Sequence, residues 1–307
     1  MRALDFSLDV LVAVLKSVPT VIFALFGLVL CWLCILAVYI CFLRMSLCMG
    51  RESVEGFQFE WPFPKKPSLF YRFCSNTVLT SVFLVSKLLF AFNLNKITVV
   101  NKDKLLSLIR DRSRPLITVA NHRSNLDDPL LWTIFSFREF ISGRSRFRYI
   151  LAAHNICFTN AWHTAFFSLG RCVPVVRGIG VYQRAVDFCI DMLAENKWVH
   201  VFPEGKVTPK PIRIKWGVAR MIMESPIPPL VVPIWAERMG EVFTSDPPFR
   251  PHFGKHVNVT VGDVLDMKEY VNRFDGKTEI ERRKAIADIV QEHLFALGRK
   301  VNSSSTP

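Results

Sequence analysis

Short runs rich in β-branched and aromatic residues alternate with segments of helical periodicity from about residue 97 onward, and this alternation constrains the fold more than any other feature. The β-rich runs cover residues 97–100, 115–120, 148–153, 172–176, 198–202, 229–235 and 257–262. The helical segments cover residues 102–112, 129–137, 181–196, 215–224 and 279–299, the last with Ile280, Ala285, Ile289 and Leu294 towards one face. This order predicts one α/β domain with a mostly parallel sheet flanked by helices, whose functional loops lie at the carboxyl ends of the strands.

The N-terminal part of the chain is apolar enough to enter a membrane. No residue between Lys16 and Arg44 carries a charge, and about 20 apolar residues are enough to cross a bilayer. A cleaved signal peptide would have a shorter apolar region, and a transit peptide would lack acids such as Asp5 and Asp9. We therefore expect a retained anchor over residues 1–50 that contains a transmembrane or interfacial helix. Basic residues after the apolar segment favour a cytosol-like side for the domain that follows.

A second apolar stretch, residues 74–95, is interrupted only by Lys87. It predicts a helix that either packs on the folded domain or lies in the membrane plane with Lys87 reaching the headgroups. The expected organisation is thus a linker with a second membrane-associated helix over 51–96, a folded domain over 97–300, and a disordered tail over 301–307.

The chain is strongly basic, with 39 Lys and Arg against 26 Asp and Glu, a net charge of +13, and half of its residues hydrophobic. This composition excludes a disordered or repeat-tract protein and points to anionic partners, either phospholipid headgroups or nucleic acid. One basic run among aromatic residues contains Arg138, Arg144, Arg146 and Arg148. Such a run could bind RNA or anionic lipid, or face solvent; beside a membrane anchor we expect lipid and no nucleic-acid partner.

The eight cysteines are scattered among apolar residues, as small buried side chains usually are. Cys31 and Cys34 have CxxC spacing, but no second ligand pair follows them. We therefore expect no metal site and no disulfide framework.

One polar loop follows the β-rich run 115–120 and reads NHRSNLDDP over residues 121–129. His122 on the loop can meet Asp127 if Asp127 stands just before a helix, with Asp128 as N-cap and Pro129 in the first turn. Asp127 would then accept the Nδ1 proton of His122 and leave the other ring nitrogen free as a general base. No enzyme nucleophile is needed if the substrate supplies its own hydroxyl. A polar turn that merely caps a helix is the alternative.

A second motif, FPEG, follows the β-rich run 198–202 and occupies residues 202–205. Gly205 allows a close approach of the backbone, and Glu204 is an acid at the edge of the predicted sheet. Several cations follow it, namely Lys206, Lys210, Arg213, Lys215 and Arg220. This cluster is suited to a phosphate group, with a solvated basic loop as the alternative.

Together these motifs resemble the glycerolipid acyltransferase family, which is marked by an NHxxxxD block, a Gly-to-Arg block, an FPEG block and a strand that contains proline. All four occur in order, at Asn121–Asp127, Gly170–Arg177, Phe202–Gly205 and Val231–Pro233, and the specific resemblance covers about residues 115 to 245. The Gly-to-Arg block is one residue longer than usual, and Thr208 stands where many members have Ser.

The resemblance implies His122 and Asp127 as the catalytic pair, a glycerolipid acyltransferase fold, and no bound cofactor. It also implies that the FPEG and Arg blocks hold the glycerophosphate part of the substrate. The candidate substrate-binding residues are therefore Asn121, Arg177, Phe202, Pro203, Glu204 and Gly205, to which the positive charge of the loop adds Lys206 and Arg213.

Three functions follow from the resemblance and the anchor. The first is a phospholipid–lysophospholipid transacylase that remodels cardiolipin or other phospholipids without CoA. The second is an acyl-CoA-dependent lysophospholipid acyltransferase with the same His and Asp. The third is a non-catalytic membrane scaffold, which would have no need for two intact polar motifs. The resemblance favours a mitochondrial membrane facing the intermembrane space, and the long apolar segment also suits the endoplasmic reticulum.

Overall fold

The computed structural model describes residues 60–244 and 249–304 and, within the N-terminal segment, residues 29, 32, 33, 35, 36, 39 and 40. Most of the predicted anchor, including Cys31 and Cys34, therefore lies outside the described residues. The seven described N-terminal residues are helical and exposed. One of them, Tyr39, stacks on Trp162 with ring centroids 5.7 Å apart, which places this segment beside the folded domain.

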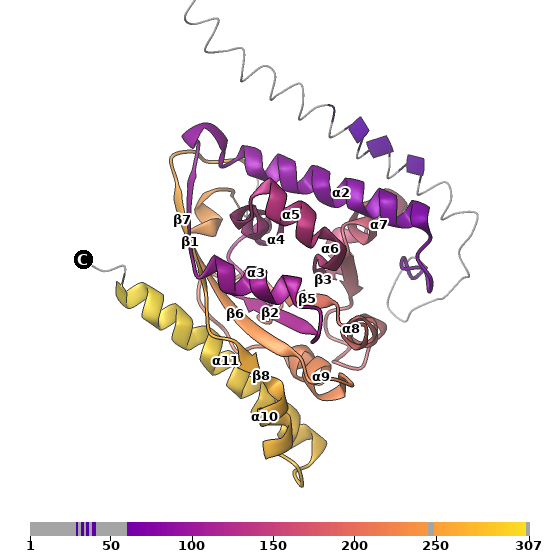
Figure 1. Ribbon diagram of the computed structural model, residues 1–307, viewed down its shortest axis with the longest axis vertical. Coiled ribbons are helices and arrows are strands. Elements are labelled where there is room, and N and C mark those ends of the chain that lie inside the picture. Colours follow the sequence, from indigo (N-terminus) through magenta and orange to yellow (C-terminus); the bar gives the residue numbers. More distant parts are fainter. Residues whose placement is uncertain are drawn as a thin grey trace, which may run out of the picture.

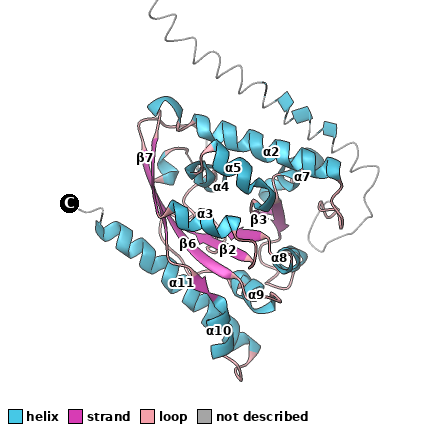
Figure 2. Ribbon diagram, viewed as in Figure 1, coloured by secondary structure: helices cyan, strands magenta, loops and turns pink. Residues whose placement is uncertain are grey.

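A mixed sheet of eight strands forms the centre of the domain (Figures 1 and 2). The strands are β1 (Lys96–Val100), β2 (Leu116–Ala120), β3 (Tyr149–Ala153), β4 (Cys172–Val175), β5 (Trp198–Val201), β6 (Leu230–Glu237), β7 (His256–Val261) and β8 (Leu265–Asp266). Their order is β1-β7-β6-β2-β5-β3-β4, and β8 pairs with β6. Pairing is parallel except between β6 and β7 and between β6 and β8. The seven predicted strands and the mostly parallel sheet are confirmed; β8 is too short to give a sequence signal.

Helices cover both faces of the sheet. They are α2 (Leu69–Leu88), α3 (Lys102–Arg110), α4 (Asp127–Leu131), α5 (Phe137–Gly143), α6 (His154–Cys157), α7 (Ala161–Leu169), α8 (Arg184–Ala194), α9 (Gly217–Glu224), α10 (Met267–Arg273) and α11 (Glu279–Ser304). Short 3₁₀ turns are η1 (Ala91–Asn93), η2 (Trp132–Ile134), η3 (Arg144–Arg146) and η4 (Met239–Glu241).

The two central strands, β2 and β5, are buried on both faces, which explains their nearly continuous apolar sequences. In β2, Ile117 and Val119 pack with α8, α9 and α11, whereas Leu116 and Ala120 pack with α2, α3, α4 and α5. Side chains that alternate between two cores fix the register of the strand, because a slip by one residue would exchange the faces. The loop at the carboxyl end of β2 is therefore held in a defined place.

Helix α2 contains most of the second apolar stretch and packs against α4, η2 and α7. Val78 and Phe83 are among its buried residues, whereas Leu69 and Phe73 are 83% and 67% exposed. The prediction of a helix packed on the domain thus holds for one face, and a second face leaves apolar side chains uncovered. Of the described part of the chain, only the segment Leu69–Asn93 is both long and apolar enough to span a bilayer.

Two predicted helices differ in their ends. The segment predicted as one helix over 129–137 forms α4 and η2, and α5 begins anew because Ser136 and Glu139 make a capping box. The C-terminal helix continues to Ser304, so the disordered tail is wrong for residues 301–304; residues 305–307 lie outside the described part. The buried positions of α11 include Ile286, Ala287, Val290 and Leu294, whereas Ile280 is exposed because it precedes the part of the helix that reaches the sheet.

Two arginines of the basic run are structural and do not form a lipid-facing surface. Arg146 is buried and donates hydrogen bonds to the backbone carbonyls of Leu108 at 2.6 Å and Asn196 at 3.0 Å, and to others. Arg148 is buried in an ion pair with Asp128 and donates to the carbonyl of Gly170 at 2.9 Å. The expectation of anionic lipid around the whole run is therefore wrong, because buried guanidinium groups must be satisfied inside the protein. Arg138 remains exposed.

Candidate active site

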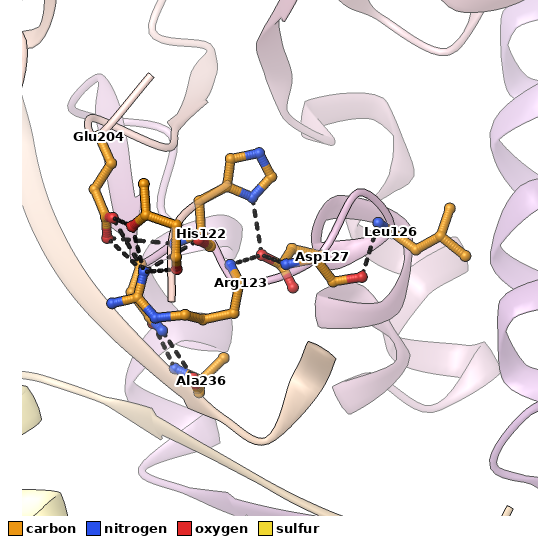
Figure 3. A network of polar contacts seen from close by, with 9 residues as sticks. His122, Arg123, Leu126, Asp127, Glu204 and Ala236 are labelled. Carbon is orange, nitrogen blue, oxygen red and sulfur yellow. Dashed lines mark hydrogen bonds and ion pairs between the residues drawn. The ribbon is translucent and has the colours of Figure 1, made fainter. Parts of the chain in front are cut away.

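The two polar motifs meet at one edge of the sheet (Figure 3). His122 lies two residues after the carboxyl end of β2, and Phe202 directly follows β5. Because β2 and β5 are parallel neighbours, with Ile117 opposite Val199, their following loops open at the same edge. Both motifs thus lie at the carboxyl ends of strands, as predicted, and the parallel pairing of β2 and β5 brings them together.

His122 and Asp127 form a hydrogen-bonded pair, with 2.8 Å between His122 Nδ1 and Asp127 Oδ2. The same carboxylate oxygen accepts the backbone N–H of Ser124 at 2.8 Å and that of Arg123. An acceptor at Nδ1 fixes the tautomer that carries the proton there and leaves the lone pair on Nε2. In Figure 3 this second nitrogen points away from Asp127, and the His122 side chain is 18% exposed. A proton acceptor is therefore open to an incoming hydroxyl.

The loop winds around the Asp127 carboxylate. Asp127 is the first residue of α4, so the prediction that Asp128 is the N-cap and Pro129 the first helical residue is wrong by two positions. Asp127 turns back to the preceding N–H groups, and Asp128 pairs with Arg148 and with Trp132 Nε1 at 2.9 Å. Ser124 is fully buried and accepts the N–H of Leu126 at 3.2 Å, so it is a turn hydroxyl rather than a nucleophile.

The Phe202 ring lies flat against the His122 imidazole, with 4.3 Å between centroids and 12° between planes. Its other neighbour is His200, whose ring meets Phe202 edge-on at 4.7 Å. Burial, with smaller contributions from Arg148 and His122, holds the pKa of His200 well below its usual range. Of these two imidazoles, only His122 is partly exposed, and the flat contact with Phe202 fixes the plane of its ring.

Glu204 is fully buried and joins the two motifs through Arg123. Its oxygens accept Arg123 Nη1 at 3.1 and 3.0 Å, and one of them also accepts the Thr208 hydroxyl at 2.6 Å. Arg123 Nη1 is further shared with the carbonyls of His122 at 3.1 Å and Thr208 at 3.0 Å. These contacts occupy the Glu204 carboxylate within the protein, so the structure does not place it against substrate as predicted. We call Arg123, Glu204 and Thr208 the buried clamp.

Arg123 was not a predicted site residue. Its signal in the sequence is indirect: Glu204 is the only acid between Pro203 and Arg220, and a buried acid at a strand end needs a partner from a neighbouring loop. Nothing in the sequence alone shows that Arg123, the residue after His122, supplies that partner.

Three other predicted residues shape the backbone. The Asn121 amide is buried and exchanges two 2.8 Å hydrogen bonds with the backbone of Ala236, which extends the pairing of β2 with β6 beyond the strand end. The carbonyl of buried Pro203 accepts the N–H of Lys215 at 2.7 Å. Gly205 has φ +74°, a conformation that a residue with a Cβ rarely adopts. These three residues therefore fix the backbone of the two loops that carry the site.

The predicted cations separate into two groups. Arg177, which follows β4, and Lys206, which follows β5, are exposed and make no ion pair with any described residue. Arg213 is instead paired with Asp288 of α11 at 2.8 Å, so the structure does not bring it to the His122 loop. Of the three cations predicted to bind substrate, Arg177 and Lys206 are thus the two left for a phosphate at the carboxyl edge. Within the described ranges, no cluster of three or more metal-ligating side chains occurs.

Comparison with known proteins places this arrangement in a family. An acyltransferase family model matches residues 96–237. Tafazzin from Drosophila melanogaster is 41% identical over 255 residues, which cover 80% of this chain and 67% of that protein. The Dictyostelium discoideum protein named taffazin is 37% identical over 212 residues, covering 66% and 73%.

The fold also matches the crystal structure of the 1-acyl-sn-glycerophosphate acyltransferase PlsC from Thermotoga maritima, with a TM-score of 0.51 and 16% identity over 92% of this chain and 98% of that one. At this identity the match concerns the fold alone. The sequence relatives, in contrast, carry the identification, and the chain belongs to the glycerolipid acyltransferase family as a tafazzin-like phospholipid acyltransferase.

Proposed function

We propose that this acyltransferase moves a fatty acyl chain from a phospholipid to the free hydroxyl of a lysophospholipid, as in cardiolipin or phospholipid remodelling. The observation that carries the proposal is the His122–Asp127 pair, whose hydrogen bond leaves Nε2 available at the edge of the sheet. A base in this position needs a substrate hydroxyl rather than an enzyme nucleophile. Candidate nucleophiles nearby are unsuited: Ser124 is buried, and burial raises the pKa of the Cys157 thiol to about 11.

The reaction begins when Nε2 of His122 takes the proton of the lysolipid hydroxyl as its oxygen attacks the donor ester carbonyl. Asp127 stabilises the imidazolium that forms, because its carboxylate accepts the Nδ1–H. The tetrahedral intermediate then collapses, its bond to the departing alkoxide breaks, and the imidazolium returns the proton to that oxygen. One ester bond forms and one breaks, so no net proton or redox cofactor is consumed. Arg177 and Lys206 lie where exposed positive charge attracts the phosphates of the lipids.

The acyl donor is tested with purified protein, labelled phosphatidylcholine and an acceptor lysolipid, in the absence of any CoA species. We expect the label to appear in the acceptor, because the proposed mechanism needs only an ester carbonyl and a hydroxyl. The same mixture with His122→Ala protein serves as control. Transfer that occurs only after acyl-CoA is added would overturn the transacylase proposal and establish the acyl-CoA-dependent alternative.

We further propose that the enzyme is membrane-associated and mitochondrial, with the endoplasmic reticulum as the alternative. The support is the uncharged segment before Arg44, the exposed apolar face of α2, and the family likeness. A tagged full-length protein is expected to co-localise with a mitochondrial marker, and deletion of residues 1–50 is expected to weaken membrane association. Co-localisation with an endoplasmic reticulum marker would contradict the mitochondrial assignment.

A further inference from the structure

Two segments that are distant in sequence lie side by side at the end of α2. One is the turn 89–95 that leads into β1, and the other is the segment 249–255 that leads into β7. The buried side chain of Asn95 donates to the carbonyls of Leu89 at 2.9 Å and His252 at 3.0 Å and accepts the N–H of Lys255 at 2.9 Å. The N–H of Gly254 donates to the carbonyl of Leu94 at 2.6 Å. The two segments therefore form one surface.

Large apolar side chains gather on this surface. Phe92, Leu94, Phe249 and Phe253 are 54%, 38%, 56% and 55% exposed, and we call these four residues the apolar tip. Phe249 stacks on Phe243 with ring centroids 6.4 Å apart, so Phe243 supports the Phe249 ring. Single exposed apolar residues are ordinary, whereas several on two segments that hydrogen bonds hold side by side are typical of an interaction site.

Two residues of the turn 89–95 have an unusual backbone conformation, and one of them, Phe92, belongs to the apolar tip. Phe92 and Asn93 have φ of +53° and +59°. A bulky residue rarely adopts this left-handed conformation, because its Cβ then crowds the backbone. The structure tolerates it where the backbone is fixed by the Asn95 hydrogen bonds. Strain maintained to present an aromatic ring at the surface points to a use for that ring.

Positive charge surrounds the tip. Lys96, Arg250 and Lys255 make no ion pair with any described residue. Glu241, whose charge interacts with that of Lys255, is itself paired with Arg238 at 2.9 Å. Exposed apolar side chains flanked by cations without ion pairs suit the interface of an anionic membrane. There the apolar side chains enter the headgroup region and the cations bind phosphates.

The tip lies on the same side of the sheet as the catalytic loop. β6 runs parallel to β2 and ends at Glu237, so its carboxyl end shares the edge at which His122 lies. The chain then passes the catalytic loop so closely that a Cβ on Gly240 would meet the Arg123 carbonyl oxygen at 2.8 Å. From η4 it continues to the tip, and the segment Leu69–Asn93 ends there as well (Figure 1).

We propose that the apolar tip, with Lys96, Arg250 and Lys255, contacts the interface of an anionic phospholipid membrane and so brings the carboxyl edge of the sheet to its lipid substrates. This contact deepens the membrane association proposed above and rests on it. It is separate from α2 and from the N-terminal segment, because it uses irregular backbone at the end of the sheet. It does not depend on which acyl donor is used.

The direct test places an environment-sensitive fluorescent amino acid at position 253, or at position 280, in the full-length protein. Ile280 is the matched control, because it is 64% exposed on α11. On vesicles of phosphatidylcholine with phosphatidylglycerol, the probe at 253 is expected to shift to the blue and to be quenched by brominated lipid chains, and the probe at 280 is not. Equal behaviour of the two probes would overturn the proposal, whether or not the protein transfers acyl chains.

The functional test compares the double variant Phe249→Ser/Phe253→Ser with Ile280→Ser. On anionic vesicles the double variant is expected to raise the apparent KM at least about tenfold, because two rings no longer enter the interface. In detergent–lipid mixed micelles its kcat is expected to equal that of the unchanged protein. An equal loss in vesicles and micelles, or no loss in either, would contradict a membrane contact at the tip.

Discussion

Replacement of His122 by alanine is expected to lower the kcat of acyl transfer by about 10³-fold, within the range that general base catalysis contributes. In the proposed mechanism Nε2 of His122 accepts the substrate proton, and the neighbouring His200 is buried with its pKa held well below the usual range, so it offers no substitute. The rate is measured with labelled phospholipid and lysolipid in mixed micelles. Circular dichroism and vesicle sedimentation should show an unchanged fold and membrane attachment.

Two further variants separate catalysis from general damage. His293→Ala removes an exposed histidine on α11 and is expected to keep full activity. Phe202→Leu keeps an apolar side chain but loses the ring that stacks on His122, and should lower kcat about 3- to 10-fold with little change in KM. If His122→Ala retained a substantial part of the turnover, another group would have to be the base and the proposed chemistry would be wrong.

Breaking the buried clamp is expected to have the largest effect on stability. In Glu204→Gln, the mostly buried guanidinium of Arg123 loses its counter-charge, and removal of one partner of such a pair costs about 3–5 kcal/mol. The free energy of unfolding in detergent is the measured quantity. Activity should fall as well, because the same contacts hold the backbone of His122 beside the loop after β5.

A double-mutant cycle tests whether the two charges act on each other. Arg123→Met combined with Glu204→Gln leaves neither charge uncompensated, so its destabilisation should be clearly smaller than the sum of the single changes. Arg299→Met is the control, since its pair with Glu292 lies at the surface and should contribute about 0–1 kcal/mol. Strictly additive effects of the Arg123 and Glu204 changes would show that the ion pair does not couple the motifs.

The parts of the fold that follow from short-range pattern are predictable from the sequence. The β-rich runs match β1 to β7, because short runs of β-branched residues leave a strong local signal, which is most continuous in β2 and β5, the strands buried on both faces. The His122–Asp127 pair is also predictable, because the two residues are only five positions apart in the sequence, between the end of β2 and the start of α4. The start of α4 is not, since Asp127 uses its carboxylate on preceding N–H groups and leaves the helix without a side-chain cap.

What the sequence could not provide are the contacts between loops. A sequence motif does not show whether a polar side chain faces substrate or protein, and the side chains of Asn121 and Glu204 both bind groups of the protein. The same limit explains Arg148 and Arg213, whose partners Asp128 and Asp288 lie on other elements. Charge in a sequence predicts an anionic partner but not whether the chain itself provides it.

The central position of β2 and β5 has a consequence for how such an enzyme can diversify. The groups that orient the His122 imidazole follow these two strands closely, since Asp127 begins α4 shortly after β2 and Phe202 directly follows β5; β2 and β5 are the best-buried strands in the described chain. The outer helices, the edge strands and the apolar surfaces contribute nothing to the dyad itself. Mutation can therefore remodel the surfaces proposed to meet the membrane and the headgroups over generations, while the proposed His122–Asp127 dyad is inherited unchanged.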